Sequence, residues 1–139
     1  MIPASAIRIM IVDDDSGMRR LIRRSLQHVG LTQVFEARDG LEALTRVLEE
    51  RIHIVICDYS MPVMNGLDLL EAIRNDPKLS KVGFIMLSGV TENDVIRKAE
   101  ALGVNGYIIK PFSLVDLQQR LDALFHKLNG RNIEWRMAS

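Results

Sequence analysis

The sequence predicts an α/β fold in which helices cover a parallel β-sheet, and three observations support this prediction. Short runs rich in Ile and Val recur along the chain, each bounded by turn residues, as is typical of buried strands. Segments with helical periodicity separate these runs. The alternation of strand and helix then favours a parallel sheet, because βαβ crossovers place every carboxyl end at one edge. The five expected strands are Arg8–Val12, Thr32–Ala37, Ile52–Cys57, Gly83–Leu87 and Tyr107–Ile109.

The first part of the chain supplies two strands and two helices. Arg8–Val12 leads through an acidic turn into a helix that we expect to begin near Ser16 and to stop at Gly30. Thr32–Ala37 is short and comparatively polar, which favours the edge of the sheet, and Gly40–Arg51 has helical periodicity. The residues expected to face the core are Met18, Leu21, Ile22, Leu26 and Val29 in the first helix, and Leu41, Leu44, Val47 and Leu48 in the second.

The middle of the chain contains the expected central strand. Ile52–Cys57 is the most continuously apolar of the five runs, as is typical of a strand covered on both faces. The segment Met61–Gly66 is an expected loop that opens a helix running to about Arg74. Asn75-Asp76-Pro77 ends this helix, because proline disfavours helical geometry in the residue before it.

The last part of the chain repeats the same pattern twice. After Gly83–Leu87 we expect a helix from about Thr91 to Leu102, with Val95, Ile96, Ala99 and Leu102 facing inward. After Tyr107–Ile109 we expect a last helix from about Ser113 to Leu128, closed by Asn129-Gly130. Five strand–helix units thus account for nearly the whole chain.

Composition limits the classes of protein to consider. The 139 residues suit one domain, and 47% hydrophobic and 26% charged residues are ordinary for a globular protein. Lys plus Arg equals Asp plus Glu at 18 each, which argues against direct nucleic-acid binding or attraction to anionic membranes. Cys57 is the lone cysteine, so no internal disulfide can form. No apolar run approaches the roughly 18 residues of a membrane span. The expected location is cytoplasmic.

The expected organisation is an N-terminal arm (1–6), one domain (7–128) and a C-terminal tail (129–139). The arm lacks the charged start of a signal peptide. The tail carries the only tryptophan, Trp135. A large aromatic side chain is costly to expose, so Trp135 either packs back on the domain, which we favour, or anchors a partner.

Polar residues interrupt the apolar runs at four strand ends. Asp13 and Asp14 follow the first strand, Asp58 the third, Ser88 the fourth and Lys110 the fifth. These side chains should therefore converge at the edge where open α/β sheets bind ligands. Clustered carboxylates repel one another and suit Mg²⁺, which prefers oxygen ligands. A carboxylate can accept a phosphoryl group, and a lysine and a hydroxyl can hold phosphoryl oxygens.

These residues resemble those of a known family. Val12-Asp13-Asp14, the segment Asp58–Gly66, Ser88-Gly89 and Lys110-Pro111-Phe112 match, in order and spacing, the receiver domains of two-component response regulators, over about residues 7–128. The resemblance implies a doubly wound, flavodoxin-like (βα)₅ sandwich of three layers, with strand order 2-1-3-4-5. It also implies a mainly bacterial signalling protein similar to single-domain chemotaxis regulators.

The resemblance assigns roles by position. Asp58 matches the aspartate that accepts a phosphoryl group from a histidine kinase. Asp13 and Asp14 match the acids that bind Mg²⁺ with Asp58 and the backbone carbonyl of Ser60. Lys110 matches the phosphate-binding lysine, before a proline that commonly follows a cis peptide in this family.

Two further residues match the switch of the family. Ser88 takes the place of the switch Ser/Thr that moves toward the phosphoryl group, and Tyr107 that of an aromatic side chain that swings inward. The output face would consist of the helix near 91–102, the strand 107–109 and the helix near 113–128. Val90, two residues beyond Ser88, cannot orient a hydrolytic water by hydrogen bonding. We therefore expect slow or intermediate self-hydrolysis of the phosphorylated form.

The leading hypothesis is a stand-alone receiver, not an enzyme beyond weak autophosphatase activity. Its expected partners are a sensor histidine kinase or histidine phosphotransfer protein and a downstream target protein, and the chain would be a monomer or a phosphorylation-dependent dimer. It could also be a fragment of a larger regulator. The basic side chains of the first helix form either a solvated face or a docking surface for the phosphodonor: Arg19, Arg20, Arg23 and Arg24.

Two functions of other classes compete with this hypothesis. A haloacid-dehalogenase-like phosphatase also arranges Asp, Ser/Thr and Lys around Mg²⁺. That family needs an Asp-x-Asp motif on its first strand and another acidic pair after the lysine, whereas Asp116 and Asp122 lie within the last expected helix. A nucleotide or flavin binder needs a glycine-rich phosphate loop, which the acidic turn after Val12 does not provide.

Overall fold

The computed structural model describes residues 1–137. The central domain alternates strand and helix, and a two-residue strand lies near each terminus. In chain order the elements are β1 (Ile2–Pro3), a 3₁₀ turn (Ala4–Ala6), β2 (Arg8–Val12), α1 (Ser16–His28), β3 (Gln33–Ala37), α2 (Gly40–Glu49), β4 (Ile54–Asp58), α3 (Gly66–Asn75), β5 (Gly83–Ser88), α4 (Asn93–Ala101), β6 (Gly106–Ile109), α5 (Leu114–Asn129) and β7 (Ile133–Glu134).

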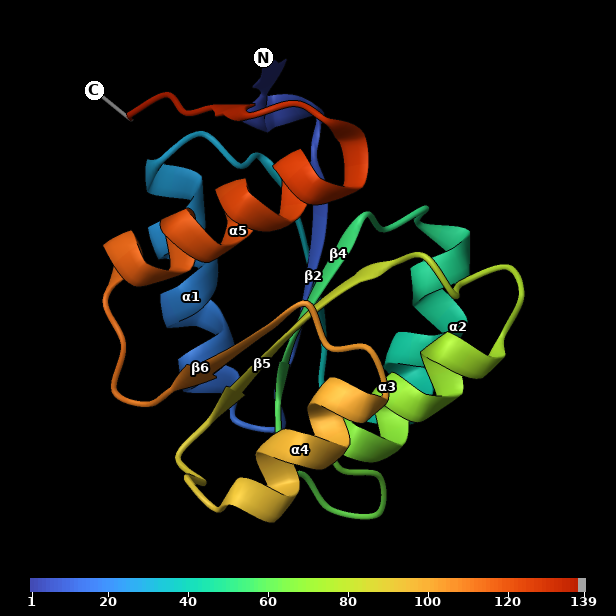
Figure 1. The fold of residues 1–139 in the computed structure, drawn as a ribbon. Coiled ribbons are helices and arrows are strands. Elements are labelled where there is room, and N and C mark those ends of the chain that lie inside the picture. Colours follow the sequence, from blue (N-terminus) through green and yellow to red (C-terminus); the bar gives the residue numbers. More distant parts are fainter. Residues whose placement is uncertain (138–139) are drawn as a thin grey trace.

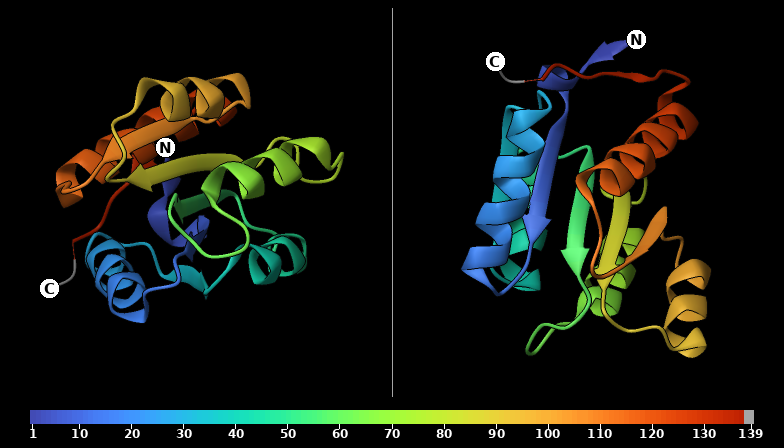
Figure 2. Two further views of the ribbon diagram at one scale, coloured as in Figure 1. Left: turned by 90° about the horizontal axis from the view of Figure 1, so that it is seen from below. Right: turned by 90° about the vertical axis from the view of Figure 1, so that its left-hand side faces the viewer.

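The main sheet has five parallel strands in the order β3-β2-β4-β5-β6. This order confirms the expected 2-1-3-4-5 topology, because β2 is the first strand of the five. The apolar run at Ile54–Asp58 forms the middle strand, and the more polar β3 lies at an edge, both as predicted. Figure 1 shows the sheet between two groups of helices, and the turned views in Figure 2 show the three layers.

Alternate residues of each strand pack against different helices, as the two-residue period of a strand requires. One cluster of buried residues joins the strands to α1 and α5: Ile9, Ile11, Ile54, Ile56, Ile85 and Leu87 with Ile22, Leu26, Leu117 and Leu121. The other joins them to α2, α3 and α4: Met10, Val12, Val55, Cys57, Phe84 and Met86 with Ala43, Val47, Leu69, Ile73 and Ala99. The sheet is thus buried on both faces, which explains its nearly continuous apolar strands.

Three residues expected to be inward in the first two helices are exposed. In α2 the buried side chains are Ala43 and Val47, whereas Leu41 and Leu48 are 61% and 48% exposed. Gly40 is buried on the same face, and Met64 packs against it, since a Cβ on Gly40 would come within 2.4 Å of the Met64 sulfur. Leu21 of α1 is likewise 60% exposed.

The expected inward face of α4 is only partly buried, although Leu102 does pack against the core. Of the four residues predicted to face inward, Ala99 is buried, whereas Val95, Ile96 and Leu102 are only half-buried. Small alanine is the residue that approaches the sheet, so α4 contributes little apolar burial to the core.

The segments near the two ends of the chain meet above α1 and α5 in the view of Figure 1, where Ile2–Pro3 pairs in parallel with Ile133–Glu134. Ile133 is buried, and its N–H donates to Asp122 Oδ1 at 2.7 Å. Trp135 is half-buried and packs against the cluster of α1 and α5, as expected. Within residues 1–137, none of the helices is long and apolar enough to cross a membrane.

Candidate functional site

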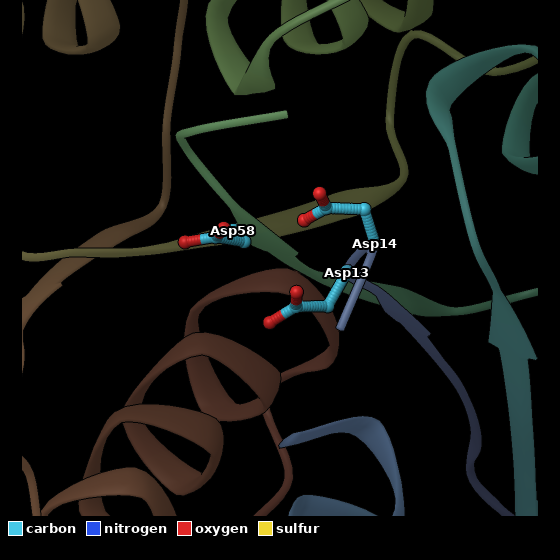
Figure 3. A group of neighbouring side chains, drawn as sticks. All are labelled: Asp13, Asp14 and Asp58. Atoms are coloured by element: carbon cyan, nitrogen blue, oxygen red, sulfur yellow. The ribbon is translucent and has the colours of Figure 1, made fainter. Parts of the chain in front are cut away.

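Three carboxylates meet at the carboxyl edge of the sheet. Asp13 and Asp14 follow β2, and Asp58 ends β4, the neighbouring strand. One oxygen of each carboxylate lies within 4.8 Å of one oxygen of each of the others. Figure 3 shows the three side chains directed to the same side of the sheet edge. Adjacent parallel strands end here side by side, so residues 45 positions apart in the sequence become neighbours.

A lysine from the far side of the sheet reaches this cluster. Lys110 follows β6, and its Nζ donates to Asp58 Oδ1 at 2.8 Å. The Asp58 and Lys110 side chains are 11% and 26% exposed, so the pair is largely withdrawn from water. Lys110 precedes a cis peptide bond to Pro111, which agrees with the pattern of the resembled family. The Lys110 ammonium group is thus placed beside the cluster of Asp13, Asp14 and Asp58.

Burial and charge both act on Asp13, which is 3% exposed. Burial raises the pKa of the Asp13 carboxyl, and the neighbouring Asp58 carboxylate adds to this effect. A hydrogen bond from the Asp15 backbone N–H to Asp13 Oδ1, at 2.9 Å, acts in the opposite direction. The ionised form is therefore disfavoured in the folded protein, and a cation bound beside Asp13 would relieve this penalty.

The other polar residue of the acidic turn has a local role. Asp15 caps α1, because its Oδ1 accepts from the backbone N–H groups of Gly17 and Met18 at 2.9 and 3.2 Å. Cys57, next to Asp58, is fully buried, and burial raises the pKa of its thiol. Neither residue adds a ligand or a nucleophile to the site.

The loop after Asp58 is held close to the end of β4. The Gly66 N–H donates to the Tyr59 carbonyl at 2.9 Å, and a Cβ on Gly66 would lie 2.8 Å from the Asp58 carbonyl oxygen. Glycine is therefore required where α3 begins. In the loop between Asp58 and Gly66, Val63 is 98% exposed and has a φ of 67°, a backbone conformation that costs a residue with a side chain about 1–2 kcal/mol. Ser60, whose carbonyl is a predicted ligand, lies exposed in this loop.

The two predicted switch residues are linked through the backbone of one residue, Val90. Ser88, 1% exposed at the end of β5, accepts a hydrogen bond from the Val90 N–H at 2.9 Å. The Val90 carbonyl in turn accepts from the Tyr107 hydroxyl at 3.0 Å. The part played by the Val90 backbone could not be found from the sequence, because every residue type apart from proline carries the same N–H and C=O groups.

The basic residues of α1 divide into two pairs. Arg19 and Arg23 both form ion pairs with Glu36 of β3, at 3.1 and 2.9 Å. Arg19 also donates to the Asp13 carbonyl, so it braces the turn that carries the acids. Arg20 and Arg24 are exposed. The predicted four-residue basic face is therefore reduced to two exposed arginines.

The donor set fits a hard divalent cation. Carboxylate oxygens are the ligands that Mg²⁺ prefers, and it typically takes one or two carboxylates while keeping several waters. Asp13 and Asp58, which are 3% and 9% exposed, and the exposed Asp14 provide such ligands at an open edge. The acids of the competing phosphatase hypothesis are used elsewhere: Asp116 completes the capping box of α5, and Asp122 accepts from the Ile133 N–H.

Known proteins resemble this chain over most of its length. The family model for the response regulator receiver domain matches residues 9–122. The chemotaxis protein CheY of Pseudomonas aeruginosa is 38% identical over 124 residues, which cover 89% of this chain and 100% of that protein. Chemotaxis protein CheY-3 of Vibrio cholerae is 39% identical over 122 residues, covering 88% of this chain and 94% of that protein.

Solved structures give the same result. The chemotaxis protein CheY4 of Vibrio cholerae, crystallised at low pH, matches with a TM-score of 0.79 and 30% identity over 85% of this chain and 98% of that chain. A response regulator receiver domain protein from Clostridium thermocellum matches with a TM-score of 0.80 and 27% identity over 87% of this chain and 95% of that chain. Because the family model spans most of the sequence and the relatives align over nearly their full lengths, this chain belongs to the response regulator receiver domain family and is of the CheY type.

Proposed function

We propose that this protein accepts a phosphoryl group on Asp58, with Mg²⁺ bound by Asp13, Asp14, Asp58 and the Ser60 carbonyl. The observation that carries the proposal is the contact of Lys110 Nζ with Asp58 Oδ1 at 2.8 Å, beside two further acids within 4.8 Å. A single lysine and a metal-binding set of carboxylates around one acid suit phosphoryl transfer better than they suit a structural ion pair.

The phosphodonor would be a phosphohistidine of a sensor kinase or phosphotransfer protein. An Asp58 carboxylate oxygen attacks phosphorus, an O–P bond forms, and the P–N bond to the histidine ring breaks. The electron pair of that bond stays on the ring nitrogen, so a phosphohistidine ring protonated at its other nitrogen leaves as neutral imidazole. When bound, Mg²⁺ would neutralise charge on the transferred phosphoryl oxygens. Lys110 Nζ, already beside Asp58, would hold another of these oxygens by a charge-assisted hydrogen bond.

The new phosphoryl group would act on the output face through Ser88. Its hydroxyl can donate to a phosphoryl oxygen, which requires a rotation that disturbs the 2.9 Å hydrogen bond from the Val90 N–H. Since the Val90 carbonyl accepts from the Tyr107 hydroxyl, a shift of the Val90 backbone would release the tyrosine. The α4–β6–α5 surface would then present a different face to its target protein.

The return to the unphosphorylated form would be slow. Hydrolysis needs a water held in line with the O–P bond, and the apolar Val90 side chain offers no hydrogen bond for it. We therefore propose weak autophosphatase activity, so that the phosphorylated form persists long enough to find its partner. A phosphoryl half-life of about a second would contradict this part of the proposal.

Intact-mass spectrometry after incubation with acetyl phosphate tests the proposal. We expect one phosphoryl adduct that needs Mg²⁺ and is absent in Asp58→Asn. Asp68→Asn is a matched control, because Asp68 belongs to the capping box of α3 and asparagine keeps an acceptor there. An adduct that persists in Asp58→Asn, or no adduct under any condition, would contradict phosphorylation at this site.

A further inference from the structure

We propose that Arg74 fastens the C-terminal end of α4 and makes this end the pivot about which the helix moves when the Asp58 site changes state. Arg74 lies at the end of α3 and contacts the segments that precede β5 and β6, whereas Asp58 lies at the opposite, carboxyl edge of the sheet. Arg74 is thus a positioning residue that acts through α4. The inference rests on the switching proposed above, but its first test needs no phosphorylation.

Arg74 joins two loops through its whole guanidinium group. Nη1 donates to the carbonyls of Ser80 and Val82, at 3.1 and 2.6 Å. Nε and Nη2 both donate to the Gly103 carbonyl, at 3.1 and 2.8 Å, and Nη2 also donates to Asn105 Oδ1 at 2.9 Å. These contacts use all five N–H groups that an arginine side chain offers. Every acceptor is a neutral oxygen, so the side chain serves as a clamp rather than as half of an ion pair.

The clamped end of α4 is also closed by its own backbone. The Gly103 N–H donates to the Glu100 carbonyl and the Val104 N–H to the Ala99 carbonyl, each at 3.0 Å. This is the pattern of a Schellman motif, and Gly103 has the positive φ of 84° that the motif requires. The carbonyl of Gly103, the residue at the centre of this motif, accepts both the Nε and the Nη2 hydrogen bonds of Arg74. The C-terminal end of α4 therefore has few ways to move.

The other end of α4 lacks such attachments. Side chains cap the first turns of α1, α2, α3 and α5, but Glu92, the N-cap residue of α4, makes no side-chain cap hydrogen bond. A Cβ on Gly89, in the preceding loop, would have no neighbour within 4 Å. Val95 and Ile96 are half-buried, and Ala99, toward the clamped end, is the buried residue of the helix. Figure 1 shows α4 on the outside of the molecule, beside α3.

The loose end is the one that the switch residues reach. Ser88 and Tyr107 are both bonded to Val90, three residues before the helix begins. A displacement of the Val90 backbone would therefore be applied at the loose end, while Arg74 holds the far end. If the N-terminal end of α4 is displaced while its C-terminal end stays fixed, the helix axis must rotate. The Arg74 contacts would thus convert a local shift at Val90 into a change of helix orientation.

Amide hydrogen exchange of the unphosphorylated protein, followed by NMR, is the first test. We expect the Ile96 amide, bonded to the Glu92 carbonyl at the loose end, to exchange at least ten-fold faster than the Leu102 amide, bonded to the Lys98 carbonyl at the clamped end. Equal rates at the two ends, or faster exchange at Leu102, would overturn the proposal.

Substitution of the clamp is the second test. Arg74→Lys keeps the charge but replaces the five-donor fork, so we expect exchange at Leu102 to rise about ten-fold and that at Ile96 to stay unchanged. Arg46→Lys is the matched control, because Arg46 is also a half-buried helical arginine that donates to a backbone carbonyl, that of Glu36, but lies in α2. Equal acceleration throughout the protein by Arg74→Lys, or the same effect from Arg46→Lys, would reduce Arg74 to a general stabiliser and refute the pivot.

Acetyl phosphate with Mg²⁺ provides the third test. In the wild type, among the amides from Val90 to Gly103, the chemical-shift changes on phosphorylation should be largest from Val90 to Asp94 and smallest at Gly103. In Arg74→Lys the changes should extend to Gly103. A wild-type change at Gly103 as large as that at Val90 would overturn the pivot. If no adduct forms at Asp58, the proposed function fails, and the exchange rates of the unphosphorylated protein still decide for or against the clamp.

Discussion

Replacing Asp13 by asparagine should stabilise the fold while weakening its metal site. The asparagine side chain would keep an oxygen for the Asp15 N–H, which now donates to Asp13 Oδ1 at 2.9 Å, but would remove a buried negative charge. At 4.8 Å, the upper limit of the separation from Asp58, two charges repel by about 3.5 kcal/mol at an effective dielectric constant of about 20. The attraction of Asp13 to Lys110 offsets part of this repulsion. We therefore expect a net gain of about 1–2 kcal/mol in the free energy of unfolding.

The pH dependence of this gain follows from the raised pKa of Asp13. The unfolded carboxyl titrates near its ordinary value of 3.8, and the folded one above it, so the folded state binds more protons between the two pKa values. Wild-type stability is therefore penalised above the folded pKa, and the penalty disappears as the pH falls to 3.8. The advantage of Asp13→Asn should be complete at about pH 7 and lost by about pH 3.5.

Urea denaturation without metal, at pH 7 and at lower pH, measures this difference. A second series with Mg²⁺ should reverse the order of the two proteins, since a ligand at about ten times its Kd adds about 1.4 kcal/mol to the wild type alone. Asp68→Asn, which changes the capping box of α3 and not the acidic cluster, should change neither series. If Asp13→Asn proves destabilising at pH 7 without metal, repulsion within the acidic cluster is not what shapes this site.

Three further outcomes are expected. Lys110→Gln should slow phosphorylation of Asp58 by acetyl phosphate about ten-fold or more in a mass-spectrometric time course, because a charge-assisted hydrogen bond contributes about 1.5–3 kcal/mol; an unchanged rate would count against the lysine. Burial, with a smaller effect from nearby Arg8, lowers the pKa of His53, whose Nδ1 accepts the Arg8 backbone N–H at 2.9 Å. The free energy of unfolding should therefore fall as the pH drops below 6.5, the ordinary pKa of histidine. In His53→Gln the urea midpoint should depend less on pH between about pH 7 and 5. Gly66→Ala should cost about 1–3 kcal/mol by urea denaturation, since its Cβ would approach a sulfur at 2.4 Å, and equal stability of Gly66→Ala and the unobstructed Gly89→Ala would contradict this packing.

Much of the fold could be predicted from local signals. Short Ile/Val runs bounded by turn residues located all five strands of the main sheet, and Gly30 and Gly130, both with positive φ, lie just beyond the helix ends that they were expected to mark. The inward faces of α2 and α4 could not be predicted as well. A helical stripe gives the direction of the core only to within about one residue, and the buried side of α2 carries Gly40, Ala43 and Val47.

The sequence by itself determined which chemical groups end the strands. Asp13, Asp14, Asp58, Ser88 and Lys110 follow from the order of apolar runs and polar stops, because a parallel sheet brings its carboxyl ends to one edge whatever the details of packing. Motif spacing then indicated the family, and the comparisons with known proteins agree.

Only the tertiary structure decided how these groups are connected. The hydrogen bonds of Val90 with Ser88 and Tyr107, and those of Arg74 with Gly103, join segments through backbone N–H and C=O groups. Nearly every residue carries such groups, so no pattern of side chains predicts their partners. The same holds for the raised pKa of Asp13, which depends on burial and on the approach of Asp58 from another strand. The reactive side chains can be located from the sequence, whereas the contacts that connect them to Val90 and to α4 depend on distances that only the folded structure sets.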